Sequence, residues 1–328
     1  MKDFYDWQYS MRSKIAEINQ RLLESIQTDE KYLYDMAKYT IEAGGKRFRP
    51  LLTILSFEIA SGESYEKILD LATGYELIHT ASLIHDDIID HSDMRRGRYT
   101  LSYRDGINNA IVVGDYLFAK AYELGSRYGK EVSKIMADAS SNLAEGQILE
   151  AENIGNLNMS EDIYLKIIEN KTARFFAACA LGATTAAGAD YNISSKLSGF
   201  AYNMGMAFQI TDDILDIIGN EKDMGKPAMV DLSHDVITLP IIYALKNNEY
   251  KDKINDILTG NYKGSNLKDE FKKIIMETNA LDHSFKVAKD YINKSVSYLS
   301  GIGRSRDLDL LMELAMIVIE RIDEAGLI

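Results

Sequence analysis

The chain has 328 residues, 46% hydrophobic and 27% charged, which is typical of a globular protein that can bury a large core. Its 50 acidic and 37 basic side chains give a net charge of −13, which argues against nucleic-acid binding because such binding depends on neutralising phosphates. The single cysteine, Cys179, excludes an intramolecular disulfide and indicates a reducing compartment. The first residues lack the apolar core of a signal peptide, and the most apolar stretch, 175–189, is shorter than the roughly 20 residues that span a bilayer. We therefore expect a cytoplasmic protein without a transmembrane segment.

Apolar residues recur with helical spacing along almost the whole chain, and alternating strand patterns are nearly absent. The first helices are expected in the ranges 3–43 (two helices, with a break near 27–29), 50–61 and 64–91. After a polar loop at 91–106, helices are expected at 107–128, 131–154, 160–188, 191–219 and 234–248. A second long loop is expected at 219–235, and three or four further helices between 251 and 328.

The chain contains few residues that break helices. Three prolines in 328 residues favour long helices, and no stretch rich in Pro, Gly and Ser divides the sequence. The sequence therefore predicts an all-α fold, a bundle of about ten or more helices that forms a single domain over 1–328.

The stretch ELIHTASLIHDDIID, 76–90, places three acids at the end of an apolar helical pattern. On a helix with 3.6 residues per turn, spacings of three and four bring one set of side chains onto the same face. This set is His79, Leu83, Asp86, Asp87 and Asp90, with Ser82 at its edge. The position of His79 on this acidic stripe favours a functional role, whereas His85 lies off the stripe and is interpreted as structural.

A second stretch, QITDDILD at 209–216, repeats the spacing with Gln209, Asp212, Asp213 and Asp216. Either cluster alone could be a solvated helix face, but apolar residues flank both and favour burial. A buried carboxylate cluster without cations would take up protons. Mg²⁺ resolves this conflict, because it binds oxygen ligands and commonly combines one or two carboxylates with substrate phosphates. The two clusters are therefore predicted to face each other across several Mg²⁺ ions and a diphosphate.

Basic residues near these clusters could bind the diphosphate. The segment GGKRFRP, 44–50, carries three cations after a glycine pair and lacks the Walker A pattern. The remaining candidate phosphate ligands are Arg95, Arg96, Lys171, Thr172, Lys226 and the amide of Gln209. Arginine offers paired donors to phosphate oxygens and lysine a point charge.

Taken in order, these motifs resemble the polyprenyl synthetase family, the trans-isoprenyl diphosphate synthases. The matching segments are GGKRFRP at 44–50, His79, DDIID at 86–90, RRG at 95–97, GD at 114–115, GQ at 146–147, KT at 171–172, Gln209, DDILD at 212–216, GKP at 225–227 and TLP at 238–240. The resemblance covers about residues 40–245. It implies an isoprenoid synthase type I fold, with helices around a central cavity, and a homodimer.

The resemblance also implies the roles of individual residues. Two or three Mg²⁺ ions per active site are expected on the two clusters, Asp86, Asp87 and Asp90 on one side and Asp212, Asp213 and Asp216 on the other. Isopentenyl diphosphate is expected at Lys46, Arg49, His79 and Arg96. The allylic diphosphate is expected at Arg95, Lys171, Thr172, Gln209 and Lys226. The residues expected to act in ionisation are Asp86, Asp87, Asp90, Arg95, Lys171, Asp212 and Lys226.

The implied reaction is ionisation of the allylic diphosphate, attack by the double bond of isopentenyl diphosphate and loss of a proton. Metal ions and cations stabilise the leaving diphosphate. One position departs from the family pattern, because Val236 stands where a lysine is expected before the TLP segment. That departure predicts the loss of one diphosphate contact.

Product length is expected to depend on the residues four and five positions before the first aspartate. Bulky aromatics there stop growth early in this family, whereas this chain has Ser82 and Ala81. We therefore expect an all-trans product longer than geranylgeranyl diphosphate. A deeper floor, at Ile78, Phe118 or Met136, would instead stop the chain at geranylgeranyl length. A geranylgeranyl or farnesyl diphosphate synthase is therefore the alternative. A terpene cyclase of the same fold, or a non-catalytic regulatory subunit of a prenyl synthase, would also account for part of the pattern.

Overall fold

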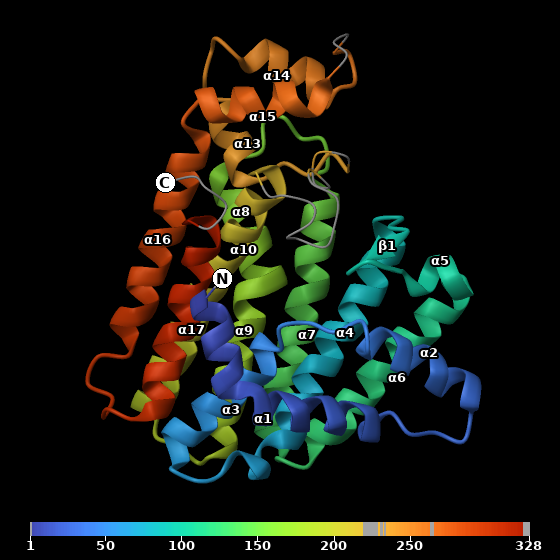
Figure 1. Cartoon of the computed structure of the whole chain (residues 1–328), viewed down its shortest axis with the longest axis vertical. Coiled ribbons are helices and arrows are strands. Elements are labelled where there is room, and N and C mark those ends of the chain that lie inside the picture. Colours follow the sequence, from blue (N-terminus) through green and yellow to red (C-terminus); the bar gives the residue numbers. More distant parts are fainter. Residues whose placement is uncertain (1, 219–228, 230–231, 233, 263–265, 324–328) are drawn as a thin grey trace.

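The computed structural model describes residues 2–218, 229, 232, 234–262 and 266–323, with side chains from 6 to 322 (Figure 1). Lys226 and the GKP segment at 225–227 lie outside the described residues. Apart from one short hairpin, the regular structure in these ranges is helical, which confirms the all-α prediction. Among the helices of this part of the chain, none combines the length and the apolarity that a bilayer span requires.

The first half of the chain begins with helices α1 Lys2–Ser25, α2 Lys31–Ile41, α3 Phe48–Ser61 and α4 Leu69–Ile89. The strands β1 Met94–Arg95 and β2 Arg98–Tyr99 then form an antiparallel hairpin. The helices that follow it are α5 Leu101–Asp105, α6 Ile107–Ser126 and α7 Lys130–Ala151. The expected loop at 91–106 therefore contains the hairpin and one short helix.

The second half contains α8 Glu161–Ile168, α9 Arg174–Ala186, α10 Tyr191–Ile218, α13 Leu239–Ala244, α14 Lys251–Leu258, α15 Leu267–Glu277, α16 Ala280–Tyr298 and α17 Arg306–Asp323. The expected helix at 160–188 is interrupted by a π-helical turn, Glu169–Ala173, between α8 and α9. The helix expected at 234–248 extends only over α13, which has Pro240 in its first turn. Proline is tolerated there because the first N–H groups of a helix have no intrahelical partner.

Two long helices, α4 and α10, form the centre of the bundle. Helix α4 packs on α6 and α3, and α10 packs between α9 and α16. Most of α4 is buried, so its sequence is apolar on nearly all sides rather than on one face. Figure 1 shows α13, α14 and α15 at one end of the molecule and α2, α5 and α6 on one side. Both central helices carry their acidic clusters near their C-terminal ends, so the fold can place the clusters together.

The first and last described helices lie side by side. The indole Nε1 of Trp7 in α1 donates a hydrogen bond of 3.0 Å to the carbonyl oxygen of Leu310 in α17. The ring of Trp7 also packs edge-on against Phe48 at the start of α3, with centroids 6.1 Å apart. This packing brings α17 against α3 and α10, and thus close to the second acidic cluster.

Candidate active site

A cavity of about 710 Å³ lies among α4, α7, the α8–α9 segment and α10. It is lined by twelve of the residues singled out from the sequence: Arg49, His79, Ser82, Asp86, Asp90, Arg95, Arg96, Lys171, Thr172, Gln209, Asp212 and Asp213. The two acidic clusters begin 126 residues apart (212 minus 86), yet they share this one cavity. The structure therefore brings the two predicted clusters and most of the predicted cations together.

Five predicted residues remain. Lys46, Ala81, Asp87 and Asp216 do not line the cavity. Asp87 is buried beside it, and Asp216 is buried within α10. Lys226 lies outside the described residues. Val236, which occupies the position of the expected lysine, lines the cavity and presents an apolar side chain to it.

The first acidic cluster lies in the last turn of α4, where the negative end of the helix dipole disfavours carboxylates. Burial raises the pKa of Asp86 to about 6, although Lys171 and Arg95 act in the opposite direction. Asp87 forms an ion pair with Arg95, with 2.6 Å between Oδ1 and Nε. Within the described residues, no hydrogen-bond donor or ion-pair partner reaches the side chains of Asp86 and Asp90. These two carboxylates are the members of the cluster that are available to a cation.

The second cluster lies in the last turns of α10. The hydroxyl of Tyr164 donates to Oδ2 of Asp213 at 2.6 Å, and Nε2 of Gln209 donates to Oδ1 at 2.9 Å. Burial raises the pKa of Asp213 to about 7. Because both oxygens of Asp213 accept hydrogen bonds from the protein, Asp212 is the member of the pair that is better placed to bind a cation.

Asp212 has a cationic partner from the other end of the chain. Nη2 of Arg321, in α17, lies 2.6 Å from Oδ1 of Asp212. The two residues are 109 positions apart (321 minus 212), and nothing in the sequence pattern links them. Arg321 was therefore not among the predicted site residues. Tyr164 was missed too, although its position seven residues before Lys171 is close to two helical turns and is a usable signal.

Arg49 and His79 both line the cavity, and Arg49 brings a positive charge to it. The guanidinium of Arg49 lies over the rings of Phe176 and Phe175, 4.7 Å and 5.5 Å from their centroids. No carboxylate of the described residues forms an ion pair with Arg49, and its buried Nε has no acceptor there. A buried guanidinium without a counter-charge is costly, so this position favours an anionic ligand.

Burial and the surrounding arginines, Arg49 foremost, lower the pKa of His79 well below its ordinary value. The imidazole is therefore neutral at pH 7, so it can bind a ligand through a hydrogen bond and not through a positive charge. Burial and Arg321 lower the pKa of Lys46 to about 8, although Asp212 acts in the opposite direction. Lys46 is thus still largely protonated at neutral pH.

The π-helical turn carries Lys171 and Thr172 into the cavity. Lys171 pairs with Glu150 of α7 at 2.5 Å, and Glu150 and Asp86 raise its pKa although burial opposes them. Thr172 donates to Oε1 of Gln209 at 2.8 Å. Nε2 of Gln209 gives one hydrogen to Asp213, so its second hydrogen is left for a ligand. Glu150 was not singled out from the sequence. Its place four residues after Gly146, on the same helix face, is the signal that could have identified it.

Side chains from α4, α6 and α7 form a mainly apolar part of the cavity lining, which we call the apolar extension. It includes Ser82 and Leu83 of α4, Phe118 of α6, and Leu143 of α7. The ring of His85, interpreted from its place off the acidic stripe as structural, lies 5.9 Å from the ring of Phe118 and also lines the cavity. The other two candidate floor residues, Ile78 and Met136, are fully buried and do not line it.

The carboxylates suit a divalent cation that is shared with a substrate. No three His, Cys, Asp or Glu side chains in the described ranges already converge as a metal site. Asp86 and Asp90 instead offer oxygens on one side of the cavity, and Asp212 offers oxygens on the other. This donor set fits Mg²⁺, which typically combines a few carboxylate oxygens with water and phosphate oxygens.

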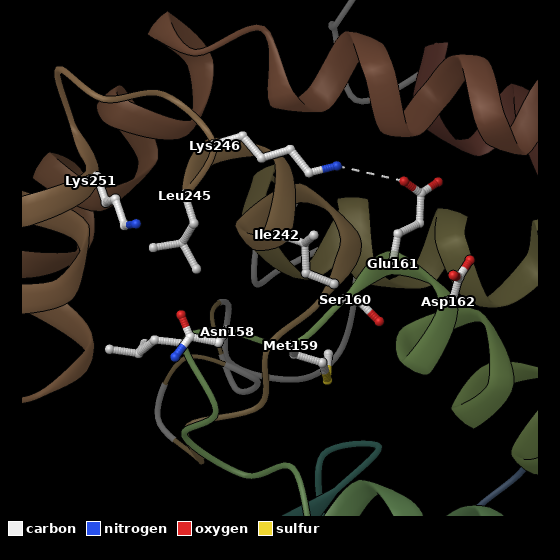
Figure 2. Close-up of a pocket in the computed structure, with 10 residues that line it drawn as sticks. Asn158, Met159, Ser160, Glu161, Asp162, Ile242, Leu245, Lys246 and Lys251 are labelled. Carbon is white, nitrogen blue, oxygen red and sulfur yellow. Dashed lines mark ion pairs between the residues drawn. The ribbon is translucent and has the colours of Figure 1, made fainter.

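A second hollow, of about 440 Å³, lies between residues 157–162 and helices α13 and α14 (Figure 2). Its acidic residue Glu161 is already bonded, since it accepts a hydrogen bond from Tyr243 at 2.7 Å and lies 3.7 Å from Nζ of Lys246. None of the predicted site residues lines this hollow. The cavity between the two acidic clusters is therefore the candidate active site.

Comparisons with known proteins agree with this assignment. The family model for polyprenyl synthetases matches residues 30–277. An octaprenyl diphosphate synthase from Haemophilus influenzae is 32% identical over 310 residues, which is 94% of each chain. Component 2 of a heptaprenyl diphosphate synthase from Geobacillus stearothermophilus is 34% identical over 94% of this chain and 95% of the relative.

A crystal structure of a polyprenyl synthase from Caulobacter crescentus, complexed with calcium and isoprenyl diphosphate, superposes with a TM-score of 0.91. The two chains are 31% identical, and the superposition covers 97% of this chain and 98% of the other. The expected isoprenoid synthase fold and prenyltransferase class are thereby confirmed. With two acidic clusters across one cavity and a family match over most of its length, the chain belongs to the polyprenyl synthetase family of prenyltransferases.

Proposed function

We infer that this protein condenses isopentenyl diphosphate with an allylic diphosphate and builds an all-trans polyprenyl diphosphate longer than geranylgeranyl. The observation that carries this inference is the geometry of the cavity. Asp86 and Asp90 from α4 and Asp212 from α10 border the same space as Arg49 and Lys171, and an apolar extension begins beside them.

The cavity offers two sets of donors for two diphosphates. Around the loop 44–47, Arg49, His79 and Arg96 line the cavity and supply two cations and a neutral imidazole suited to isopentenyl diphosphate. We add Lys46 of the same loop to this set, although it does not itself line the cavity. Arg95, Lys171, Thr172 and Gln209 also line the cavity and are suited to the allylic diphosphate. We assign Lys226, which lies outside the described residues, to the same diphosphate. Two or three Mg²⁺ ions bound to the two clusters would neutralise charge on the departing diphosphate. The chain's own cations hold that diphosphate, and its apolar side chains exclude water from the allylic fragment.

Product length follows from what borders the start of the apolar extension. Ser82 faces it with a small side chain, and Ala81 is buried in the packing of α4. Neither residue is aromatic, so α4 does not narrow the extension at these two positions. The similarity to octaprenyl and heptaprenyl diphosphate synthases supports the same inference.

Further features of the chain complete the proposal. We infer that residues 1–328 act as one polyprenyl synthetase domain in the cytoplasm, without nucleic-acid partners, and that the protein is a homodimer. Large apolar side chains on α6 support the dimer, since Ile107, Ile111 and Val112 are 51%, 43% and 56% exposed. Large contiguous patches of exposed apolar side chains commonly mark interaction sites.

The decisive experiment incubates the protein with Mg²⁺, labelled isopentenyl diphosphate and farnesyl diphosphate, and separates the dephosphorylated products by chain length. We expect labelled polyprenols longer than geranylgeraniol. A product that stops at geranylgeranyl would refute the proposed length and leave the reaction class intact. Diphosphate release only when isopentenyl diphosphate is omitted would indicate a terpene cyclase.

A non-catalytic regulatory subunit is the alternative from another class. Its signature would be no turnover with any allylic primer. The retention of both acidic clusters at one cavity argues against it. A subunit without chemistry has no need for carboxylates such as Asp86, whose pKa burial raises.

A further inference from the structure

We propose that Arg47 is a positioning residue, which together with Glu76 fixes the loop 44–47 and the first turn of α3 in the orientation that binds isopentenyl diphosphate. The inference deepens the proposed function and rests on it, because it concerns the subsite assigned to Lys46 and Arg49. Arg47 itself does not line the cavity.

The guanidinium of Arg47 uses its donors on three different helices. Nη1 donates to Oε1 of Glu76 in α4 at 2.7 Å, and Nε donates to Oδ1 of Asn19 in α1 at 2.9 Å. Nη2 donates to the carbonyl oxygen of Ile41, the last residue of α2, at 3.0 Å. Arg47 also precedes the first residue of α3. One planar side chain therefore connects four helices at the base of the loop.

The ion pair of Arg47 and Glu76 is buried, and the backbone of Arg47 has an unfavourable conformation. The side chains of Arg47 and Glu76 are each 4% exposed. Arg47 has a φ of +54°, a left-handed conformation that is unfavourable for a residue with a Cβ. Such conformations persist only where surrounding contacts enforce them, and they concentrate at functional sites. The three hydrogen bonds of the Arg47 side chain hold its own backbone in this conformation, between Lys46 and Phe48.

The geometry of the loop decides where the neighbouring cations lie. Lys46 precedes Arg47, and Arg49 follows it by two residues in the first turn of α3. Glu76 lies one helical turn before His79 on α4, so the ion pair fixes the loop relative to this histidine. Arg96 adds a further connection, because its Nη1 donates to the carbonyl oxygen of Gly44. The subsite is thus assembled before any diphosphate binds.

Two other roles are possible for the pair, and they predict different results. If Arg47 acted only as a positive charge near the diphosphate, Arg47→Lys would retain binding and Glu76→Gln would tighten it. If the pair contributed only to stability, both variants would lower the melting temperature and leave the Michaelis constants unchanged. A positioning role predicts weaker binding of isopentenyl diphosphate in both variants, because each one disrupts the planar set of contacts.

The test compares steady-state kinetics of the wild-type protein with Arg47→Lys and Glu76→Gln. We expect the KM for isopentenyl diphosphate to rise about tenfold in both, with the KM for the allylic substrate and kcat changed by less than about twofold. Asn19→Ala removes only the contact at Nε and should give a smaller rise in the same KM. If Arg47→Lys or Glu76→Gln fails to fold, the KM for isopentenyl diphosphate in Asn19→Ala tests the proposal instead.

Glu58→Gln is the matched control, since it breaks the partly buried ion pair of Glu58 with Lys14, which joins α1 and α3 away from the loop. It should lower the melting temperature without a selective effect on isopentenyl diphosphate. An unchanged or lowered KM for isopentenyl diphosphate in Glu76→Gln would overturn the proposal. Absence of condensation by the wild-type protein would instead refute the proposed function.

Discussion

The buried carboxylate of Asp86 lowers the stability of the folded protein, although it is a candidate metal ligand. Its pKa of about 6, against an ordinary value of 3.8, means that the folded protein binds a proton there more readily than the unfolded chain. Above pH 6 both states are ionised, and burial of the charge destabilises the folded state by about 3 kcal/mol. Below pH 4 both states are protonated and this cost disappears.

We therefore predict that Asp86→Asn raises the free energy of unfolding at pH 8 in metal-free buffer, by up to about 3 kcal/mol, and by little at pH 4. The same variant should lose at least about 100-fold in kcat, since it removes a carboxylate assigned to the metal. Urea unfolding at the two pH values measures the first effect. If the variant is less stable than the wild-type protein at pH 8, burial of the Asp86 charge does not destabilise the folded state.

At the scale of single elements, the π-helical turn between α8 and α9 determines where Lys171 points. Gly146 of α7 allows this turn to pack closely. A Cβ added at Gly146 would lie 2.7 Å from Cγ of Lys171 and 2.9 Å from Cβ of Asn170. Gly146 belongs to the GQ segment of the family pattern, and the close contact between two helices is the physical reason for a glycine there.

Gly146→Ala should therefore displace Lys171 and the π-helical turn. We predict a loss of about 1–3 kcal/mol in the free energy of unfolding, together with a fall in kcat/KM for the allylic substrate of tenfold or more. Gly303→Ala is the matched control, because a Cβ at Gly303 meets no atom within 4 Å. Equal activity of the two variants would show that the close approach has no part in positioning Lys171.

Helix α17 contributes to the site through Arg321, whose partner Asp212 is a candidate metal ligand. A cation bound to Asp212 competes with Arg321 for the same oxygens. Because the pair is partly exposed, its interaction is worth at most about 1 kcal/mol. Arg321→Gln should then lower the Mg²⁺ concentration for half-maximal activity by about two- to fivefold.

The control for this variant is Arg127→Gln, which removes an arginine that pairs with Asp70 at 2.5 Å outside the cavity. Its Mg²⁺ dependence should match that of the wild-type protein. A higher Mg²⁺ requirement in Arg321→Gln would mean that Arg321 orients Asp212 rather than competing for it.

At the scale of the whole molecule, local spacing was enough to predict the helices and both acidic clusters. Each cluster is a pattern within two turns of one helix, and an apolar flank on the same helix indicates its burial. The ion pairs of Asp212 with Arg321 and of Arg47 with Glu76 depend on which helices pack together, and local periodicity does not contain that information. The π-helical turn was missed for a related reason, because one extra residue in a turn scarcely changes the apolar pattern of 160–188.

The length of the product also depends on the whole molecule, since α4, α6 and α7 together border the apolar extension. Ser82 and Phe118, a residue of α6, both line this part of the cavity.

Ser82→Phe should shorten the product by several isoprene units, because an aromatic ring would fill space that a growing chain requires. Phe118→Ala should lengthen it or leave it unchanged, because removing a ring only adds space. Both variants are compared with wild type by chromatography of the dephosphorylated products, with Ser126→Phe at the exposed end of α6 as the control. If Ser82→Phe yields the wild-type length, the hydrocarbon chain leaves the acidic clusters by another route, and the geometry at Ser82 does not determine where growth stops.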